Sequence, residues 1–326
     1  MKKNYLIAFL FPILFGTIGC EKMDDLPENP LSFDNAEISY EILPRGFHTR
    51  ILCTSNNIAY TISNSGGICK TEDGGSTWIE QDSGVERLLR GIFFFDDLRG
   101  FVVGSSSINE GIILRTNDGG NSWEATDMPY SLSGIYFLDD KTGFVSGRKL
   151  YKTQDGGETW EEVHLGFSSY GDINFFDDKA GLLVSGKTLL ITRDGGYNWT
   201  PLEGIGCEYY FDKIQINKGI AYILFDGHKV LKVTDKGNAW KVIEIPSADC
   251  VYFINEQQIL VGGRRNSQIP YVYPPVFLWI SNDYGRKWSE KRLEGGYEII
   301  DIDFLNDSTA LALVAPGYII KINFRN

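Results

Sequence analysis

Apolar residues alternate with other residues in short segments that recur along most of the chain. Six segments contain an apolar-x-apolar pair: Ile51/Cys53, Ile92/Phe94, Ile135/Phe137, Ile173/Phe175, Ile214/Ile216 and Val251/Phe253. A period of two is typical of β-strands. A turn follows the pair, and a second apolar run follows the turn, as at residues 96–104 and 139–147. The pattern predicts many short strands in a repeated order.

A nine-residue motif ending in tryptophan follows each pair, at residues 70–78, 115–123, 152–160, 191–199, 232–240 and 280–288. The motif is an Asp box. Its aspartates and tryptophans are Asp73 and Trp78, Asp118 and Trp123, Asp155 and Trp160, Asp194 and Trp199, Asp235 and Trp240, and Asp283 and Trp288. Successive aspartates lie 37 to 48 residues apart, which is the length of one four-stranded propeller blade.

The box residues suit a β-hairpin turn. The Asp carboxylate accepts backbone N–H groups within such a turn, and the glycines supply the positive φ that the turn requires. We expect the Trp to begin the outer strand and to pack inward. The alternative is a ligand or calcium array, but six copies around a ring point in six directions and cannot converge on one molecule.

The end of the chain repeats the strand pattern once more without a box, at residues 302–306, 310–314 and 318–322. Residues 36–43 form an extra predicted strand before the first repeat. This strand would complete the last blade and close the ring, leaving no long unpaired edge. We therefore predict an all-β fold over residues 35–326: a seven-bladed β-propeller of four-stranded antiparallel blades.

The N-terminus indicates export. Lys2 and Lys3 precede an apolar run over residues 5–18, which predicts a signal peptide at residues 1–19. Residues 17–20 resemble a bacterial lipobox, with Thr17 where leucine is usual, and this implies lipidation of Cys20. Residues 20–34 would then be a lipidated cysteine and a flexible tether. We expect an outer-membrane lipoprotein, periplasmic or surface-exposed and held by lipid alone; the alternative is plain secretion.

The charge and the metal-binding residue types exclude several functions. The chain has 31 Lys and Arg against 43 Asp and Glu, a formal charge of −12. Nucleic acid is therefore not an expected partner, because its binding requires a basic face. The cysteines form no C-x-x-C pair and the chain has three histidines, so no metal or other cofactor is expected. We expect the cysteines of the folded domain to be free thiols.

The succession I-x-F-x-D, G-x-x-x-G and T-x-D-G-G-x-T-W resembles the photosystem II assembly and stability-factor family of Asp-box (BNR) proteins. More distantly, it resembles sialidase and sortilin-type propellers. The resemblance covers nearly all of the chain after the signal peptide. It implies a propeller that binds membrane-protein partners through one face, and it implies a binding module rather than a reaction.

Alternating strand directions would place the box turns and the short turns after the inner strands on one rim. The connections between blades and between second and third strands would lie on the opposite face, where propellers usually bind ligands. Insertions lengthen two of these connections, at residues 105–110 and 264–275. Candidate partner-binding residues lie in connections of this class: Arg45, Phe47, His48, Arg87, Arg90, Tyr130, Tyr170, Tyr209, Tyr210, Arg264, Arg265, Tyr271, Tyr273 and Tyr297. Arginine matches carboxylates and aromatic rings offer flat contact surfaces. The alternative is that they are ordinary solvated loop residues.

These features favour a non-catalytic cell-envelope lipoprotein that binds or scaffolds a protein complex or a glycan. The alternative is a glycoside hydrolase of the Asp-box type, sialidase-like or xyloglucanase-like. Such enzymes need paired carboxylates, or an arginine triad with a tyrosine nucleophile. The sialidase F/Y-R-I-P signature is absent, and the nearest segment is 43–45. Most acidic residues recur in boxes and turns, so we identify no catalytic pair.

Overall fold

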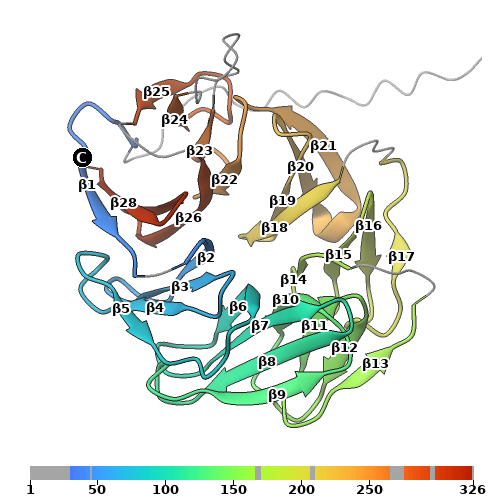
Figure 1. Ribbon diagram of the computed structural model, residues 1–326. Helices are drawn as coiled ribbons and strands as arrows, with labels where there is room; N and C mark the ends of the chain where they lie inside the picture. Colours follow the sequence, from blue (N-terminus) through green and yellow to red (C-terminus); the bar gives the residue numbers. More distant parts are fainter. Residues whose placement is uncertain are drawn as a thin grey trace, which may run out of the picture.

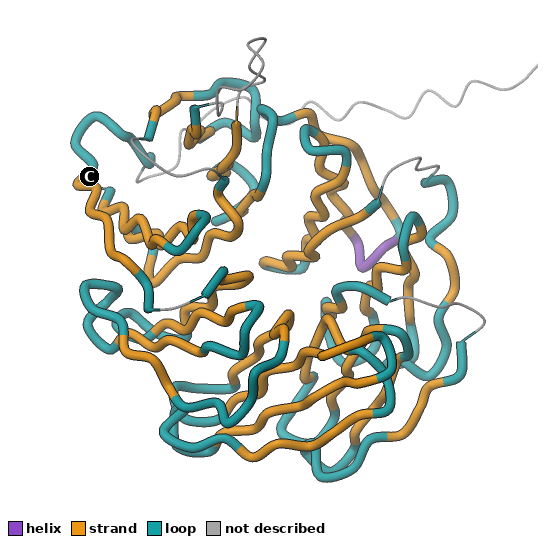
Figure 2. Tube along the Cα trace, viewed as in Figure 1, coloured by secondary structure: helices purple, strands orange, loops and turns teal. Residues whose placement is uncertain are grey.

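The computed structural model describes residues 30–44, 46–165, 170–205, 210–264, 275–293 and 298–324. Its strands form seven four-stranded antiparallel sheets that stand around a central channel (Figure 1). Strands dominate the regular structure of the described residues, and a short 3₁₀ helix, Asp235–Gly237, forms the turn between the third and fourth strands of the fifth sheet (Figure 2). This architecture confirms the predicted seven-bladed propeller. In the part of the chain that is described, no helix has the length and apolar character needed to cross a membrane.

Each blade runs from an innermost to an outermost strand. Blades one to three are β2 (His48–Cys53), β3 (Ala59–Ser63), β4 (Ile68–Thr71) and β5 (Ile79–Gln81); β6 (Leu88–Phe94), β7 (Gly100–Ser107), β8 (Glu110–Thr116) and β9 (Glu124–Met128); and β10 (Leu132–Phe137), β11 (Gly143–Gly147), β12 (Leu150–Thr153) and β13 (Glu161–Val163). Blades four and five are β14 (Ile173–Phe175), β15 (Gly181–Ser185), β16 (Thr188–Thr192) and β17 (Thr200–Pro201); and β18 (Phe211–Asn217), β19 (Ile220–Phe225), β20 (Lys229–Thr234) and β21 (Ala239–Glu244).

Blade six is β22 (Cys250–Phe253), β23 (Ile259–Arg264), β24 (Val276–Ser281) and β25 (Ser289–Arg292). Blade seven takes its inner strands from the end of the chain and its outer strand from the start: β26 (Ile299–Asn306), β27 (Thr309–Val314), β28 (Tyr318–Asn323) and β1 (Glu37–Ile42). β1 pairs with β28 in antiparallel register, from Glu37 opposite Asn323 to Ile42 opposite Tyr318. This pairing closes the ring as predicted.

The two faces of the propeller carry different connections. The Asp-box turn of a blade lies beside the turn between that blade's first and second strands: the N–H of Gly74 donates to the Asn57 carbonyl, and that of Gly156 donates to the Lys141 carbonyl, both at 2.9 Å. We call this side the Asp-box rim. The opposite side holds the connections between blades and those between second and third strands, and we call it the loop-rich face.

The box aspartates close their turns as expected. In blade one, Asp73 Oδ1 accepts the N–H groups of Ser76 and Thr77 at 2.9 and 2.8 Å, and the Thr77 hydroxyl donates to Oδ2 at 2.6 Å. Burial acts to raise the pKa of Asp73, but these bonds and one from Thr71 outweigh it and lower the pKa to about 2. Asp118, Asp155, Asp194 and Asp283 accept equivalent bonds.

The fifth box departs from the prediction. Asp235 and Lys236 both have positive φ, 48° and 50°, and the N–H of Asn238 donates to the backbone oxygen of Asp235 at 3.0 Å. The fifth box has Val233 where the other boxes have a Thr or Ser whose hydroxyl accepts a backbone N–H of the turn, and its turn is a 3₁₀ helix. Trp240 is then 40% exposed within β21, whereas Trp199 of the preceding blade is 6% exposed. The expected inward packing is wrong for Trp240.

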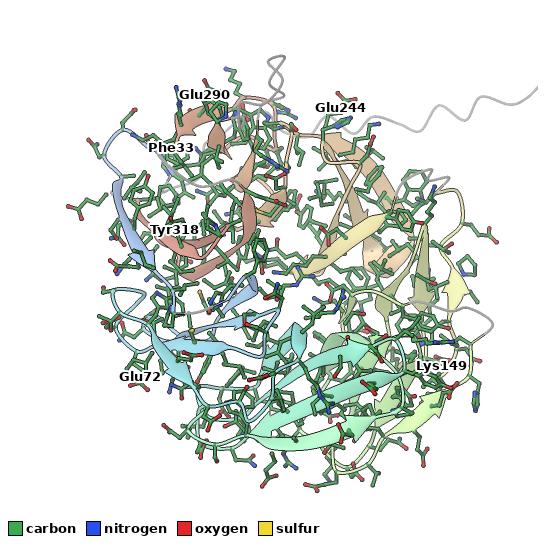
Figure 3. The ribbon with its side chains drawn as sticks, viewed as in Figure 1. Phe33, Glu72, Lys149, Glu244, Glu290 and Tyr318 are labelled. Carbon is green, nitrogen blue, oxygen red and sulfur yellow. The ribbon has the colours of Figure 1, made fainter. Side chains whose placement is uncertain are left out.

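Two glycines explain the G-x-x-x-G spacing of the second strands. A Cβ on Gly143 would lie 2.5 Å from the ring of Phe137, which fills the inner part of blade three. A Cβ on Gly147 would lie 2.0 Å from the Ser131 carbonyl of the chain that enters the blade. Side chains from neighbouring blades fill the spaces between sheets (Figure 3), and the core consists of one apolar cluster at each such interface.

Candidate functional site

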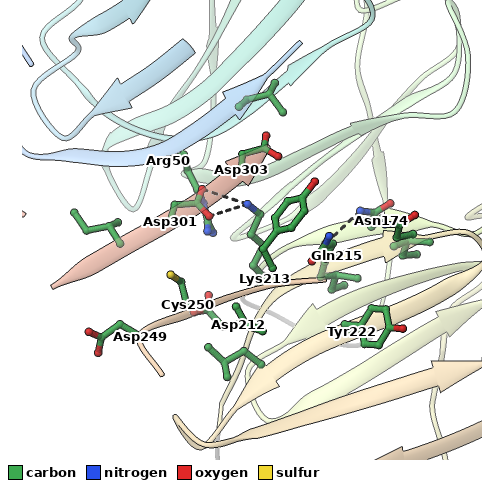
Figure 4. A pocket seen from close by; sticks show the side chains of 18 residues that line it. Arg50, Asn174, Asp212, Lys213, Gln215, Tyr222, Asp249, Cys250, Asp301 and Asp303 are labelled. Atoms are coloured by element: carbon green, nitrogen blue, oxygen red, sulfur yellow. Dashed lines mark hydrogen bonds and ion pairs between the residues drawn. The ribbon is translucent and has the colours of Figure 1, made fainter. Parts of the chain in front are cut away.

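The innermost strands place charged side chains in the central channel, on the side lined by blade one and blades four to seven. Arg50 comes from β2, Lys213 from β18, and Asp301 and Asp303 from β26; they border a cavity of about 400 Å³ (Figure 4). Lys213 Nζ donates to both oxygens of Asp301, at 2.9 and 3.2 Å. Burial acts to lower the pKa of Arg50 and of Lys213. The charges of nearby carboxylates, most strongly Asp301, outweigh burial and raise both pKa values.

These carboxylates join the last blade to the first. Asp301 Oδ2 accepts the N–H of Ile51 at 3.2 Å, and Asp303 Oδ2 accepts that of Cys53 at 2.8 Å. Burial raises the pKa of Asp303 to about 6, with Lys213 acting in the opposite direction. Innermost strands of neighbouring blades share no ladder of backbone bonds, so side chains that bond the next blade's backbone hold them together.

The same device recurs elsewhere around the channel. Asp172 Oδ2 accepts the N–H of Ile214 at 2.8 Å, between blades four and five. Gln215 bonds both backbone groups of Phe253, at 2.8 and 2.7 Å, between blades five and six. The channel residues are therefore explained by ring assembly, and we do not assign them a reaction.

A β-bulge at the start of several inner strands positions a different set of side chains. The register shifts between His48 and Arg50 in blade one, between Leu89 and Gly91 in blade two, and between Leu132 and Gly134 in blade three. The bulged residues Thr49 and Ser133 use their hydroxyls to bond the next blade, donating to the carbonyls of Leu89 and Tyr170 at 2.9 and 3.0 Å. Blade two has Arg90 at this position instead, and Arg90 is exposed.

Arg90 lines a groove that crosses the loop-rich face from blade two to blade five. We call it the loop-face groove; its volume is about 390 Å³. It is lined by Arg90, Ser105, Ile108, Ser131, Leu132, Ser133, Gly147, Arg148, Tyr170, Gly171, Val184, Gly186, Tyr210 and Phe211. Among the described residues of this lining, the cations are Arg90 and Arg148, and there is no carboxylate.

Neighbouring contacts fix some of the groove's side chains. Arg148 Nη1 donates to Asn109 Oδ1 at 2.8 Å, and its guanidinium carbon lies 5.2 Å from the Tyr130 ring centroid. Lys187 Nζ lies 5.4 Å from the ring centroid of Tyr210, a side chain that is 70% exposed. The groove thus combines positive charge with exposed aromatic and aliphatic surface on a chain that is acidic overall.

The structure brings together Arg90, Tyr170 and Tyr210 of the predicted residues, with Tyr130 beside them through Arg148. The others that are described lie elsewhere. Arg87 pairs with Asp127 at 2.6 Å, and Arg264 pairs with Asp249 at 2.9 Å. Phe47 is 42% exposed but is not part of the groove lining. The predicted residues Cys20, Arg45, Tyr209, Arg265, Tyr271, Tyr273 and Tyr297 lie outside the described residues.

His48 does not belong to the exposed face where the sequence analysis placed it. It is 0% exposed, and its ring nitrogens bond the Pro44 carbonyl at 3.0 Å and the Thr61 hydroxyl at 2.9 Å. Its role is to hold the start of β2. Residues 105–110 were expected to be an insertion in a loop, but most of them belong to strands. β7 and β8 are separated by two residues and form a long hairpin.

Sequence reasoning missed Arg148 and Lys187, although both stand in connections between second and third strands, the loop class from which candidates were chosen. It also missed the charged channel residues. Their signal was available: in the apolar-x-apolar pairs, the middle residue is Asn174 in blade four and Gln215 in blade five, and Asp303 stands between Ile302 and Phe304. A polar middle residue marks a side chain that bonds the neighbouring blade.

Within the described residues, no group of three or more His, Cys, Asp or Glu side chains is arranged to hold a metal ion. Cys53, Cys69 and Cys250 are free thiols. Burial raises the pKa of Cys250 well above its usual value, and burial also raises that of Cys53. Neither thiol is therefore activated as a nucleophile.

Several solved structures share the fold. The chain superposes on a structure described as YCF48 bound to D1 peptide with a TM-score of 0.70 and 16% identity, covering 91% of this chain and 99% of that one. For YCF48 from Cyanidioschyzon merolae the TM-score is 0.67 at 15% identity, with coverages of 87% and 98%. The GH74 enzyme of Niastella koreensis gives 0.70 at 16% identity, covering 84% of this chain but 52% of the enzyme.

At these identities the structural likeness shows the fold alone, and the chain spans about half the length of the GH74 enzyme. No curated protein matches the chain. Residues 77–169 and 162–248 match the family model described as Photosynthesis system II assembly factor YCF48, and together they make up just over half of the chain. The chain therefore belongs to the YCF48 family of seven-bladed propellers.

Proposed function

We propose that this protein is a non-catalytic binding module of the cell envelope, anchored by a lipid on Cys20, and that it holds an acidic segment of a partner protein in the loop-face groove. The observation that carries the proposal is that Arg90 and Arg148 both line one groove, and that the described lining of this groove contains no carboxylate. The guanidinium group of arginine binds carboxylates in bidentate geometry.

The shape of the groove supports an extended segment rather than a small molecule. It runs over four blades, and its described lining includes the serines of blades two and three and the glycines and Val184 of blades three and four. Membership of a family with a relative described as bound to a peptide favours a protein partner over a glycan. The Asp-box carboxylates do not supply a hydrolase site, because the Asp-box turns lie on the opposite rim and are closed by their own hydrogen bonds.

Binding to an array of random dodecapeptides with graded net charge tests the proposal. We expect the protein to retain acidic peptides, with weaker binding as salt rises, and we expect an Arg90→Ala, Arg148→Ala double variant to bind them at least about tenfold more weakly, a change of about 1.4 kcal/mol. Arg193, exposed near the Asp boxes, provides the matched control: Arg193→Ala should bind like the unchanged protein.

Equal peptide binding by the double variant and the control would show that the groove is not the binding site. Preference for oligosaccharides over every peptide would make the partner a glycan. Release of sugars from xyloglucan or from sialylated glycans would replace the binding module by the hydrolase alternative.

A further inference from the structure

The start of the described chain is fixed to the Asp-box rim. Asn282 belongs to the Asp box of blade six; its Oδ1 accepts the N–H of Leu31 at 3.0 Å and its Nδ2 donates to the Leu31 carbonyl at 2.8 Å. Leu31 and Phe33 are only 4% and 9% exposed, and the Phe33 ring lies 6.0 Å from that of Phe324. Residues at the end of the predicted tether therefore belong to the folded domain.

The direction of β1 agrees with this placement. Its first residue, Glu37, lies opposite Asn323, and the N–H of the next residue, Phe324, donates to the carbonyl of Ser308 in the turn between β26 and β27 on the Asp-box rim. Beyond its other end, the N–H of Leu43 donates to the Gly317 carbonyl in a turn of the loop-rich face at 3.0 Å. The chain thus enters the propeller at the Asp-box rim.

We infer that the Asp-box rim is the membrane-proximal side of the protein and that the loop-face groove opens away from the bilayer. This inference rests on the lipid anchor of the proposed function. Nine residues lie between Cys20 and Pro30, and a flexible chain of that length spans about 17 Å on average and about 35 Å when fully extended. The rim therefore stays close to the lipid.

The groove cannot approach the same bilayer easily. A blade is at least as deep as the six residues of β1, or about 20 Å at the rise of a strand, and loops add to that depth. Turning the loop-rich face toward the membrane would hold the nine-residue tether stretched beyond its average span, which is entropically unfavourable. The partner segment is accordingly one that reaches at least a blade's depth above the membrane, and not one that leaves the bilayer directly beside the anchor.

Fluorescence quenching by lipid tests this orientation. The full-length lipidated protein, with Cys207→Ser to remove one native thiol, is labelled at Lys287→Cys or Lys141→Cys on the Asp-box rim, or at Ile108→Cys on the loop-rich face. It is then bound to phosphatidylethanolamine–phosphatidylglycerol vesicles containing lipids with a spin label on the headgroup. We expect the strongest quenching at position 287, near the docked Leu31, less at 141, and at least fivefold less at 108 than at 287.

A Cys20→Ala protein separates this inference from the anchor itself. If that variant remains on the vesicles as fully as the unchanged protein, the lipid anchor is wrong and the orientation loses its basis. If the unchanged protein depends on Cys20 but the label at 108 is quenched as strongly as that at 287, the anchor stands and the orientation is overturned. Quenching at none of the three sites, with the protein still bound through Cys20, also overturns it.

Discussion

Asn282 forms two hydrogen bonds with the backbone of Leu31: its Nδ2 donates to the Leu31 carbonyl at 2.8 Å, and its Oδ1 accepts from the Leu31 N–H at 3.0 Å. The two residues are 251 positions apart in the sequence. This contact lies just ahead of β1 and ties the start of the chain to blade six, while β1 itself completes blade seven. The N-terminal segment is thus part of the ring closure and not only a linker.

Removing residues 30–43 should lower the thermal midpoint of unfolding by on the order of 10 °C. The deletion takes away the outer strand of blade seven and the buried side chains of Leu31, Phe33 and Leu43, each of which contributes about 1.5–3 kcal/mol when fully buried. Differential scanning calorimetry measures the change. Deletion of residues 20–29 alone is the control and should leave the midpoint unchanged; equal midpoints for both truncations would contradict a closing role for β1.

Asp73→Ala should destabilise the protein by about 1–2 kcal/mol. The change removes the acceptor of two backbone N–H groups and of two hydroxyls in the first box. Asp235 is the matched position in the irregular fifth box, where φ of 48° suits glycine. Asp235→Gly should therefore be neutral or stabilising. Urea unfolding compares the two variants, and similar losses for both would mean that the box bonds do not matter.

Asp303 should give stability a specific pH dependence. Its folded pKa of about 6 lies above the usual 3.8 because of burial, so the folded state binds its proton more tightly than the unfolded state does. Stability from this group is full below about pH 4 and is lost as the pH rises through 6. The loss is at most about 3 kcal/mol, since one pH unit corresponds to about 1.4 kcal/mol.

Urea unfolding of the unchanged protein and of Asp303→Asn between pH 4 and 7 measures this dependence. Asp303→Asn should gain stability relative to the unchanged protein as the pH rises across this range. Parallel curves for the two proteins would show that Asp303 is not a buried carboxyl with a raised pKa. Below about pH 4, both should lose stability as the box carboxylates, such as Asp73 with a pKa of about 2, become protonated.

Arg264→Ala should reduce stability by about 1–3 kcal/mol without changing peptide binding. Arg264 donates through Nε and Nη2 to Asp249, a carboxylate whose pKa is raised by burial, against the effect of Arg264 itself. Loss of the guanidinium leaves this carboxylate without its cation. Adding Asp249→Asn should restore part of the stability. A loss of peptide binding with unchanged stability would instead return Arg264 to the binding residues predicted from the sequence.

Most of the fold follows from local patterns. The alternation at pairs such as Ile135/Phe137 specifies strands, the spacing of the boxes specifies blades, and the unmatched strand at residues 36–43 implies closure with the last blade. Each of these patterns is local and repeated in several blades, so an irregular repeat, such as the box at Asp235, does not alter the architecture. The sequence also indicated the class of loop that contains Tyr210, whereas it did not show that Arg90 lies within strand β6.

Only the tertiary structure decided which loop residues form a site. The sequence cannot distinguish Arg90, which a bulge leaves exposed in the groove, from Arg264, which a neighbouring carboxylate engages, or from the buried His48. It also could not place Leu31 on the box of blade six, because that contact joins residues far apart in the chain. The repeats determine the local structure of residues that are close in the sequence. The burial of a side chain and its ion pairs depend on the residues that ring closure brings together.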